Sequence, residues 1–129
     1  MRAHKYLSKI NRLDVLANNK LREKQQVMEL LLKVGDTNGK GRARLRALDR
    51  EIDDIIDRLV GLKREAIGML EALPLDEYRV LHQYYVQGRT MEVIAAEQGL
   101  SVRQTYNVKS KALHLVQGML DTMKKAPGR

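Results

Sequence analysis

Apolar residues recur between Arg42 and Leu73 with spacings that alternate between three and four. Kept over about four heptads, this spacing is typical of a coiled-coil seam along one face of a long helix. The seam residues are Leu45, Leu48, Ile52, Ile55, Leu59, Leu62, Ala66, Met69 and Leu73. Ile56 and Leu70 lie beside the seam and widen the apolar stripe beyond what one neighbouring helix covers. We therefore predict a long helix that packs against more than one neighbour.

A weaker apolar stripe precedes this seam, from about Lys5 to Lys33. Its residues are Leu7, Ile10, Leu13, Ala17, Leu21, Met28 and Leu31, mostly three or four positions apart. The glycine-rich stretch VGDTNGKG, residues 34–41, separates the two stripes and is the clearest break in the chain. Because the two helices would be nearly equal in length, we predict an antiparallel hairpin over residues 1–73 with its hinge at 34–41. The widened stripe predicts that a second hairpin packs on the first, which gives a homodimer.

A new domain is predicted to begin at Pro74, which is unsuited to a helix interior. Asp76 favours the first turn of the next helix, which is expected to run to about Val86 and to end at Gln87 and Gly88. Its apolar residues Val80, Leu81, Tyr84 and Tyr85 are expected to form the core of this domain. The chain is thus predicted to be all-α, with a hairpin over 1–73 and a C-terminal domain over 74–129.

Within this domain the stretch from Gly88 to Leu113, GRTMEVIAAEQGLSVRQTYNVKSKAL, has the pattern of a helix-turn-helix. Thr90 can cap a short helix whose residues Met91, Ile94 and Ala95 share one face, and Gly99 can end it in the left-handed conformation. Ser101 and Gln104 have the spacing of a capping box at the start of the next helix. The inner face of that helix is predicted to hold Thr105, Val108, Ala112 and Leu115.

The outer face of the second helix carries side chains that can bond to nucleic acid, and no carboxylate occurs between Gly99 and Leu120. In a helix that docks in the major groove, the first exposed turns read base edges and neighbouring groups hold phosphates. The predicted base-reading residues are Val102, Arg103, Tyr106, Asn107 and Ser110. The predicted phosphate contacts are Arg89, Thr90, Ser101, Lys109 and Lys111. We therefore predict double-stranded DNA as a partner.

Two segments resemble a known family. The run GLSVRQTYNVKSKAL, from Gly99 to Leu113, is similar to the helix-turn-helix of sigma-70 region 4, which reads the promoter −35 element, and LPLDEYRVL from Leu73 to Leu81 matches the start of that domain. With its long charged helices first and this domain last, the whole chain resembles the phage-encoded RinA/ArpU-like regulators of late transcription. The resemblance implies a promoter-binding regulator that works in the cytoplasm of a bacterial host.

Composition and charge agree with a helical polyanion-binding protein. The chain of 129 residues has a net charge of +8, distributed as +5 over residues 1–33, 0 over 34–73 and +3 over 74–129. The N-terminal excess is interpreted as a solvated face, with a second DNA contact as the alternative. The chain contains no Cys, and it has neither an apolar run of membrane-spanning length nor an N-terminal signal. These features predict a soluble intracellular protein without disulfides.

The sequence has no complete catalytic or metal-binding pattern. Asp36 and Asn38 open a possible calcium loop, but Lys40 and Ala47 occupy positions where oxygen ligands are needed. The acidic cluster around Asp53 and Asp57 is expected to be solvated, with Asp54 paired to Arg58. The histidines have no spacing that would gather them on a metal or beside a nucleophile; they are His4, His82 and His114. The expectation is therefore no metal, no cofactor, no catalytic residues and no enzyme activity.

The sequence is compatible with three functions. The first is a transcription regulator that docks residues 102–111 in the major groove and dimerises through the hairpin. The second is an interaction module whose coiled coil binds another protein, such as RNA polymerase, and the third is a phage DNA-packaging adaptor. The sequence favours the first function, because the outer face of the second helix is polar and basic where a protein-binding face would be apolar.

Overall fold

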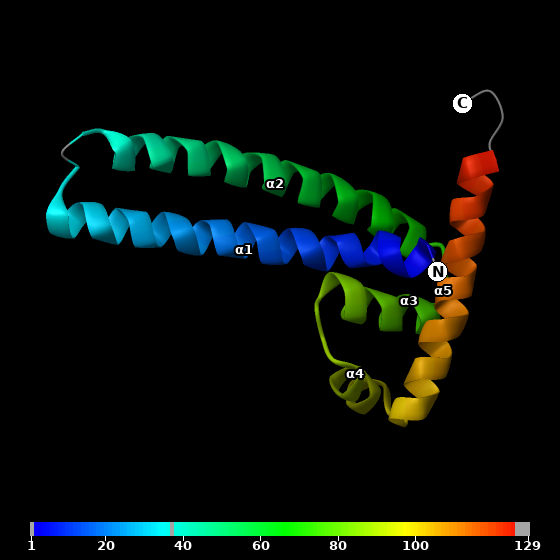
Figure 1. Ribbon diagram of the computed structural model, residues 1–129. Coiled ribbons are helices and arrows are strands. Elements are labelled where there is room, and N and C mark those ends of the chain that lie inside the picture. Colours follow the sequence, from blue (N-terminus) through cyan, green and yellow to red (C-terminus); the bar gives the residue numbers. More distant parts are fainter. Residues whose placement is uncertain (1, 37, 126–129) are drawn as a thin grey trace. The chain divides into compact units, whose positions relative to one another are not determined.

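The computed structural model describes residues 2–36 and 38–125. Along these residues the elements are α1 (Arg2–Val34), α2 (Lys40–Leu70), α3 (Leu75–Leu81), the π-helical turn η1 (His82–Val86), α4 (Met91–Gln98) and α5 (Val102–Lys125) (Figure 1). Every regular element in these ranges is helical, and none of the described residues lies in a strand. The predicted all-α class is therefore confirmed.

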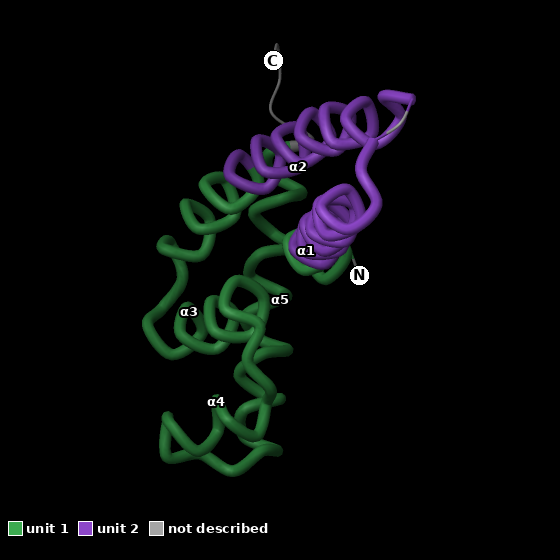
Figure 2. The backbone as a smooth tube through the Cα atoms, turned by 90° about the vertical axis from the view of Figure 1, so that its left-hand side faces the viewer, with its two compact units in different colours: residues 1–11, 62–129 green, residues 12–61 purple. Residues whose placement is uncertain are grey.

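The chain forms two compact units (Figure 2). Unit 1 contains residues 1–11 and 62–129, and unit 2 contains residues 12–61. Both long helices contribute to both units, because α1 passes from unit 1 into unit 2 and α2 returns from unit 2 into unit 1. The two units describe which parts of the chain pack together. The domain boundary predicted between residues 73 and 74 is a separate claim and stays a prediction.

Unit 2 is an antiparallel helix pair. Lys20 Nζ lies 3.1 Å from Glu51 Oε2, and Arg44 Nε donates to Glu23 Oε2 at 2.8 Å, so residue numbers rise along α1 as they fall along α2. Side chains of the predicted seam are buried between the helices; they are Leu48, Ile52 and Ile55, with Leu45 and Leu59 partly buried. The long helix pair predicted from the apolar spacing is therefore confirmed for this unit.

The stripe predicted for α1 is wrong at two positions, since Leu21 and Met28 are 45% and 47% exposed. The inward positions are instead Ala17, Lys20, Lys24, Val27 and Leu31, which keep the alternating spacing of three and four. The two lysines fit there because their long stems cover apolar surface while the ammonium groups reach carboxylates on α2. Lys24 Nζ, for example, lies 2.6 Å from Asp49 Oδ1.

The glycine-rich hinge is an ordered cap, as far as its described residues 34–36 and 38–41 go. Gly35 and Gly39 take φ of +74° and +76°. This left-handed conformation favours glycine, because glycine has no Cβ to clash with the backbone. The Asp36 carboxylate accepts from the backbone N–H of Gly41 at 3.0 Å and of Arg42 at 3.2 Å, at the start of α2. Asp36, which opens the incomplete calcium pattern of the sequence, therefore serves as a helix cap.

Unit 1 joins the first turns of α1 to the C-terminal helices, which the sequence did not indicate. The backbone N–H of Ala3 donates to Gln117 Oε1 at 3.0 Å, and His4 Nδ1 lies 2.7 Å from the Tyr85 hydroxyl. Tyr6 donates to Glu65 Oε1 at 2.6 Å, which ties the same turns to the end of α2. Leu7 and Ile10 are fully buried within this unit. The N-terminal residues thus complete the body that carries α3 to α5.

The helix that begins after Pro74 ends in a wider turn. Gln87 N donates to His82 O at 3.0 Å, the i to i+5 bond of a π-helical turn, and Gly88 then takes φ of +70°. Val80, Leu81 and Tyr85 are buried, and Tyr84 packs on the core, as predicted for this segment.

Candidate nucleic-acid interface

Three local features fix both ends of α4 and the start of α5. Thr90 Oγ1 accepts from Val93 N at 3.3 Å and caps α4, and Gly99 ends that helix with φ 67° and ψ 30°. Ser101 N donates to Gln104 Oε1 at 2.9 Å, while Gln104 N donates to Ser101 Oγ at 3.0 Å. This reciprocal pair is the capping box predicted from the sequence, and both caps and the left-handed glycine are confirmed.

A small apolar core holds the two helices together. It is formed by Val80 of α3 with Met91 and Ile94 of α4, and Tyr84 and Val108 pack against it. On α5 the fully buried residues are Thr105, Ala112 and Val116. The Thr105 hydroxyl donates to Ser101 O at 2.9 Å, so its burial leaves no polar group unpaired.

One predicted inner position of α5 is wrong. Leu115 is 39% exposed, and Val116 takes its place in the core with no exposed surface. The reason lies in the helical period: eleven residues complete about three turns, whereas ten fall roughly 80° short of the starting direction. Thr105 and Val116 therefore share a face, and Leu115 lies beside it.

The five predicted base-reading residues are exposed along one side of the first turns of α5. Val102 is 39% exposed and Tyr106 is 50% exposed. Val102, Tyr106 and Ser110 follow one another at four-residue intervals, and Arg103 and Asn107 form an adjacent row at the same interval, so the two rows form one surface. The structure thus brings all five side chains together on one exposed surface.

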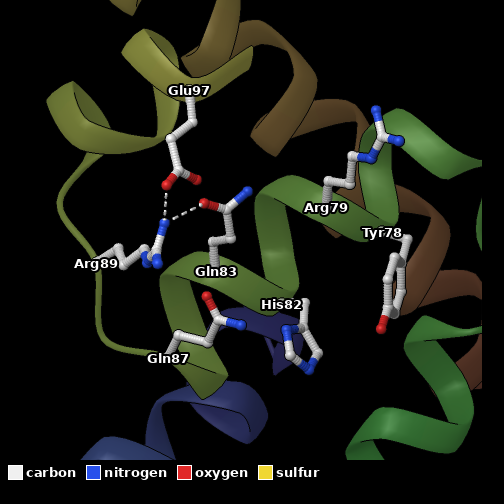
Figure 3. A pocket seen from close by; sticks show the side chains of 7 residues that line it. All are labelled: Tyr78, Arg79, His82, Gln83, Gln87, Arg89 and Glu97. Atoms are coloured by element: carbon white, nitrogen blue, oxygen red, sulfur yellow. Dashed lines mark hydrogen bonds and ion pairs between the residues drawn. The ribbon is translucent and has the colours of Figure 1, made fainter.

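Arg89 lies between η1 and α4 and is engaged within the protein (Figure 3). Its guanidinium forms an ion pair with Glu97 of α4, and Nη1 donates to Gln83 Oε1 at 3.2 Å. These three side chains, with Tyr78, Arg79, His82 and Gln87, line a cavity of about 360 Å³. No sequence pattern pointed to Gln83 or Glu97, because only the packing of η1 and α4 brings them to Arg89.

The two lysines of the predicted phosphate set have different surroundings. Lys109 Nζ lies 4.2 Å from the centroid of the Tyr84 ring, in cation–π geometry, and burial lowers the pKa of its ammonium group. Lys111 is largely exposed, and its Nζ lies 3.6 Å from Oε1 of the buried Glu77. The remaining two members, Thr90 and Ser101, are exposed at the two helix starts that they cap. The five side chains therefore lie at separate places between η1 and the middle of α5, and each already has a partner within the protein.

No group of three or more metal-ligating side chains comes together among residues 2–36 and 38–125. Within the same part of the chain, no helix has both the length and the apolar character needed to cross a bilayer. Comparisons of this chain with protein-family models, with curated proteins and with solved structures found no match.

Proposed function

We propose that the chain is a sequence-specific DNA-binding transcription regulator, with α4 and α5 as the two helices of a helix-turn-helix. The observation that carries this proposal is the connection between the helices. Gly99 and the Ser101–Gln104 capping box form a short turn between α4 and α5, which share one core. The first turns of α5 present five exposed side chains, and no carboxylate occurs in the sequence between Gly99 and Leu120. This is the arrangement with which helix-turn-helix proteins read the major groove.

The proposed readout follows from the chemistry of the two rows on α5. Arg103 offers two N–H donors to guanine N7 and O6, and Asn107 can donate to and accept from adenine. The exposed apolar parts of Val102 and Tyr106 suit contact with a thymine methyl group. Ser110, one turn further along, lies where the helix climbs toward the sugar–phosphate backbone and can contact either group.

Phosphate binding is assigned to Arg89, Thr90, Ser101, Lys109 and Lys111. Lys111 is the strongest candidate, because most of its side chain is exposed. Arg89 can contribute only after it leaves Glu97 or by sharing its remaining N–H groups, and Lys109 must leave the Tyr84 ring. The resemblance to regulators of late phage transcription supports a promoter as the DNA target, with a homodimer as the active form.

A gel-shift assay tests this function. Duplexes selected from a random pool, and a late phage promoter, are mixed with the protein alone and with RNA polymerase. The proposal expects a shifted band with the protein alone that a scrambled duplex does not compete away. A band that forms only with polymerase, or none at any duplex, overturns direct readout.

An interaction module is the second candidate, and one observation favours it. Three cations of the predicted phosphate set already contact protein groups, Arg89 at Glu97, Lys109 at Tyr84 and Lys111 at Glu77. A surface with Val102 and Tyr106 exposed beside engaged cations also suits a protein partner such as RNA polymerase. The polymerase arm of the same gel shift separates the two functions.

A further inference from the structure

The outer flank of α2 in unit 2 carries an ordered pattern of charge and apolar groups. Its residues lie at alternating spacings of four and three, so they form one stripe beside the buried seam. From the hinge onward the stripe reads Arg42, Arg46, Asp49, Asp53, Ile56 and Val60, and all six are exposed. Two basic residues are thus followed by two acidic residues and then by two apolar residues.

The hinge end of the same unit has an apolar groove of about 380 Å³. Its apolar walls come from both helices, since Met28, Leu31 and Leu32 belong to α1 and Leu45 belongs to α2. Leu32 is 87% exposed and Met28 is 47% exposed, so the groove is open to solvent. Arg42 lies at its edge with 79% of its side chain exposed, and its Nε lies 4.0 Å from Oδ2 of Asp36, which also lines the groove. An open apolar groove of this kind calls for an apolar side chain, and the exposed guanidinium of Arg42 at its edge can also meet a carboxylate beside that side chain.

That occupant exists on the stripe itself. Ile56 is 41% exposed, and Asp53 precedes it by about one turn on the same stripe of α2. We propose that unit 2 binds a second copy of itself in antiparallel orientation, with Ile56 of each copy in the hinge-end groove of the other. This inference rests on the homodimer of the proposed function and names its contact surface.

The charges of Arg46 and Asp53 agree with this arrangement, whereas the two Asp49 carboxylates, each paired with Lys24 of its own chain, come to lie near each other at the two-fold axis. When the groove at Arg42 and Leu45 receives Ile56 of the second copy, Arg46 comes to lie opposite Asp53 of that copy. The two-fold symmetry repeats each contact, so a dimer contains two Arg46–Asp53 pairs and two filled grooves. Neither Arg46 nor Asp53 forms an ion pair within the part of the chain that the structure describes. A parallel arrangement would instead place Arg46 opposite Arg46 and Asp53 opposite Asp53.

Sedimentation of the full chain at micromolar concentration tests the surface, through two complementary variants. Arg46→Asp puts two carboxylates opposite each other at both pairs of the dimer, and Asp53→Arg puts two guanidinium groups there. Each variant alone is expected to raise the dimer dissociation constant by about tenfold or more. An equal mixture of the two restores both pairs as a heterodimer, and its dissociation constant should return close to that of the parent. Arg22→Asp, the same charge change at an exposed site on α1, should leave the dimer intact.

The groove contact has its own variants. Ile56→Asp and the uncharged Ile56→Ser should both dissociate the dimer, and circular dichroism should show parental helix content because Ile56 is already partly exposed. If the dimer persists in all of these variants, the proposed contact surface is wrong, although the protein is still a dimer. A mixture that stays monomeric overturns the Arg46–Asp53 pairing. A parent that sediments only as monomer overturns both surface and dimer, and none of these outcomes depends on DNA binding.

Discussion

Lys111 Nζ lies 3.6 Å from Oε1 of Glu77, a carboxylate that is only 7% exposed. We predict that Lys111→Ala has two effects. It removes a phosphate contact, which should weaken binding to cognate and scrambled DNA alike and flatten the salt dependence by about one unit of slope. It also removes the cation beside Glu77, which should lower the free energy of unfolding by about 1 kcal/mol or less, since Lys111 is mostly solvated.

The matched variant for this prediction is Lys111→Arg, which keeps the charge. It should restore most of the DNA affinity and the stability, as measured by anisotropy titrations at two salt concentrations and by urea unfolding. A loss confined to cognate DNA would contradict the assignment of Lys111 to phosphate.

The core between α4 and α5 gives a second prediction. Ile94→Asp should unfold unit 1, because a carboxylate at a fully buried position without a partner costs several kcal/mol, comparable with the stability of a small domain. Val108→Asp should act in the same direction, since Val108 packs on the same core. Val93→Asp is the control, because Val93 is 46% exposed on the other side of α4 and its change should leave thermal melting near that of the parent. Parental melting of Ile94→Asp would show that the faces of α4 are assigned wrongly.

Stability at alkaline pH gives a third prediction. Burial, and next the neighbouring Tyr84, raise the pKa of the Tyr85 hydroxyl. The folded protein then keeps a proton that the unfolded chain loses above about pH 10, so this contribution to stability is present below that pH and is lost as pH rises further. Tyr6 adds to the loss because its pKa is raised too, and Lys109 opposes it because its pKa is lowered.

Urea unfolding at pH 8 and above pH 10 tests this account. The parent should lose stability between the two, and Tyr85→Phe should lose less, after an initial cost of about 1 kcal/mol at pH 8 for the hydrogen bond to His4. Tyr106→Phe alters an exposed hydroxyl and should follow the parent. Equal slopes for parent and Tyr85→Phe would rule out Tyr85 as a source of the pH dependence.

Sequence patterns predicted the parts of the structure that depend on near neighbours. The Thr90 cap, the left-handed Gly99 and the reciprocal Ser101–Gln104 bonds each join residues three or four positions apart, so local spacing alone indicated them. The sequence also predicted the seam on α2, because Leu48, Ile52 and Ile55 must share a face in any helix with that spacing.

The rest depended on contacts between distant segments. Nothing near Lys109 indicated that its ammonium group would lie over Tyr84, because that contact needs α5 packed on η1. The bond between His4 and Tyr85 joins residues that are 81 positions apart. Leu70, which served as an argument for a wide intermolecular stripe, is fully buried in unit 1, whereas Ile56 remains exposed. The apolar spacing could indicate that Leu70 and Ile56 pack against other residues. It could not indicate whether those residues belong to the same chain or to a second copy.

The central claim is that Arg103 and Asn107 choose the DNA sequence. Arg103→Ala and Asn107→Ala should each cost about 1–3 kcal/mol on the cognate duplex and little on a scrambled one, because each removes a bidentate contact to one base. Arg79→Ala, at an exposed site on α3, is the matched control and should preserve the ratio of the two affinities. The deciding measurement is the ratio of cognate to scrambled dissociation constants for Asn107→Ala at two salt concentrations. A ratio reduced about tenfold or more at both concentrations is the predicted result, and a ratio equal to that of the parent, with both affinities lowered alike, would contradict base readout by α5.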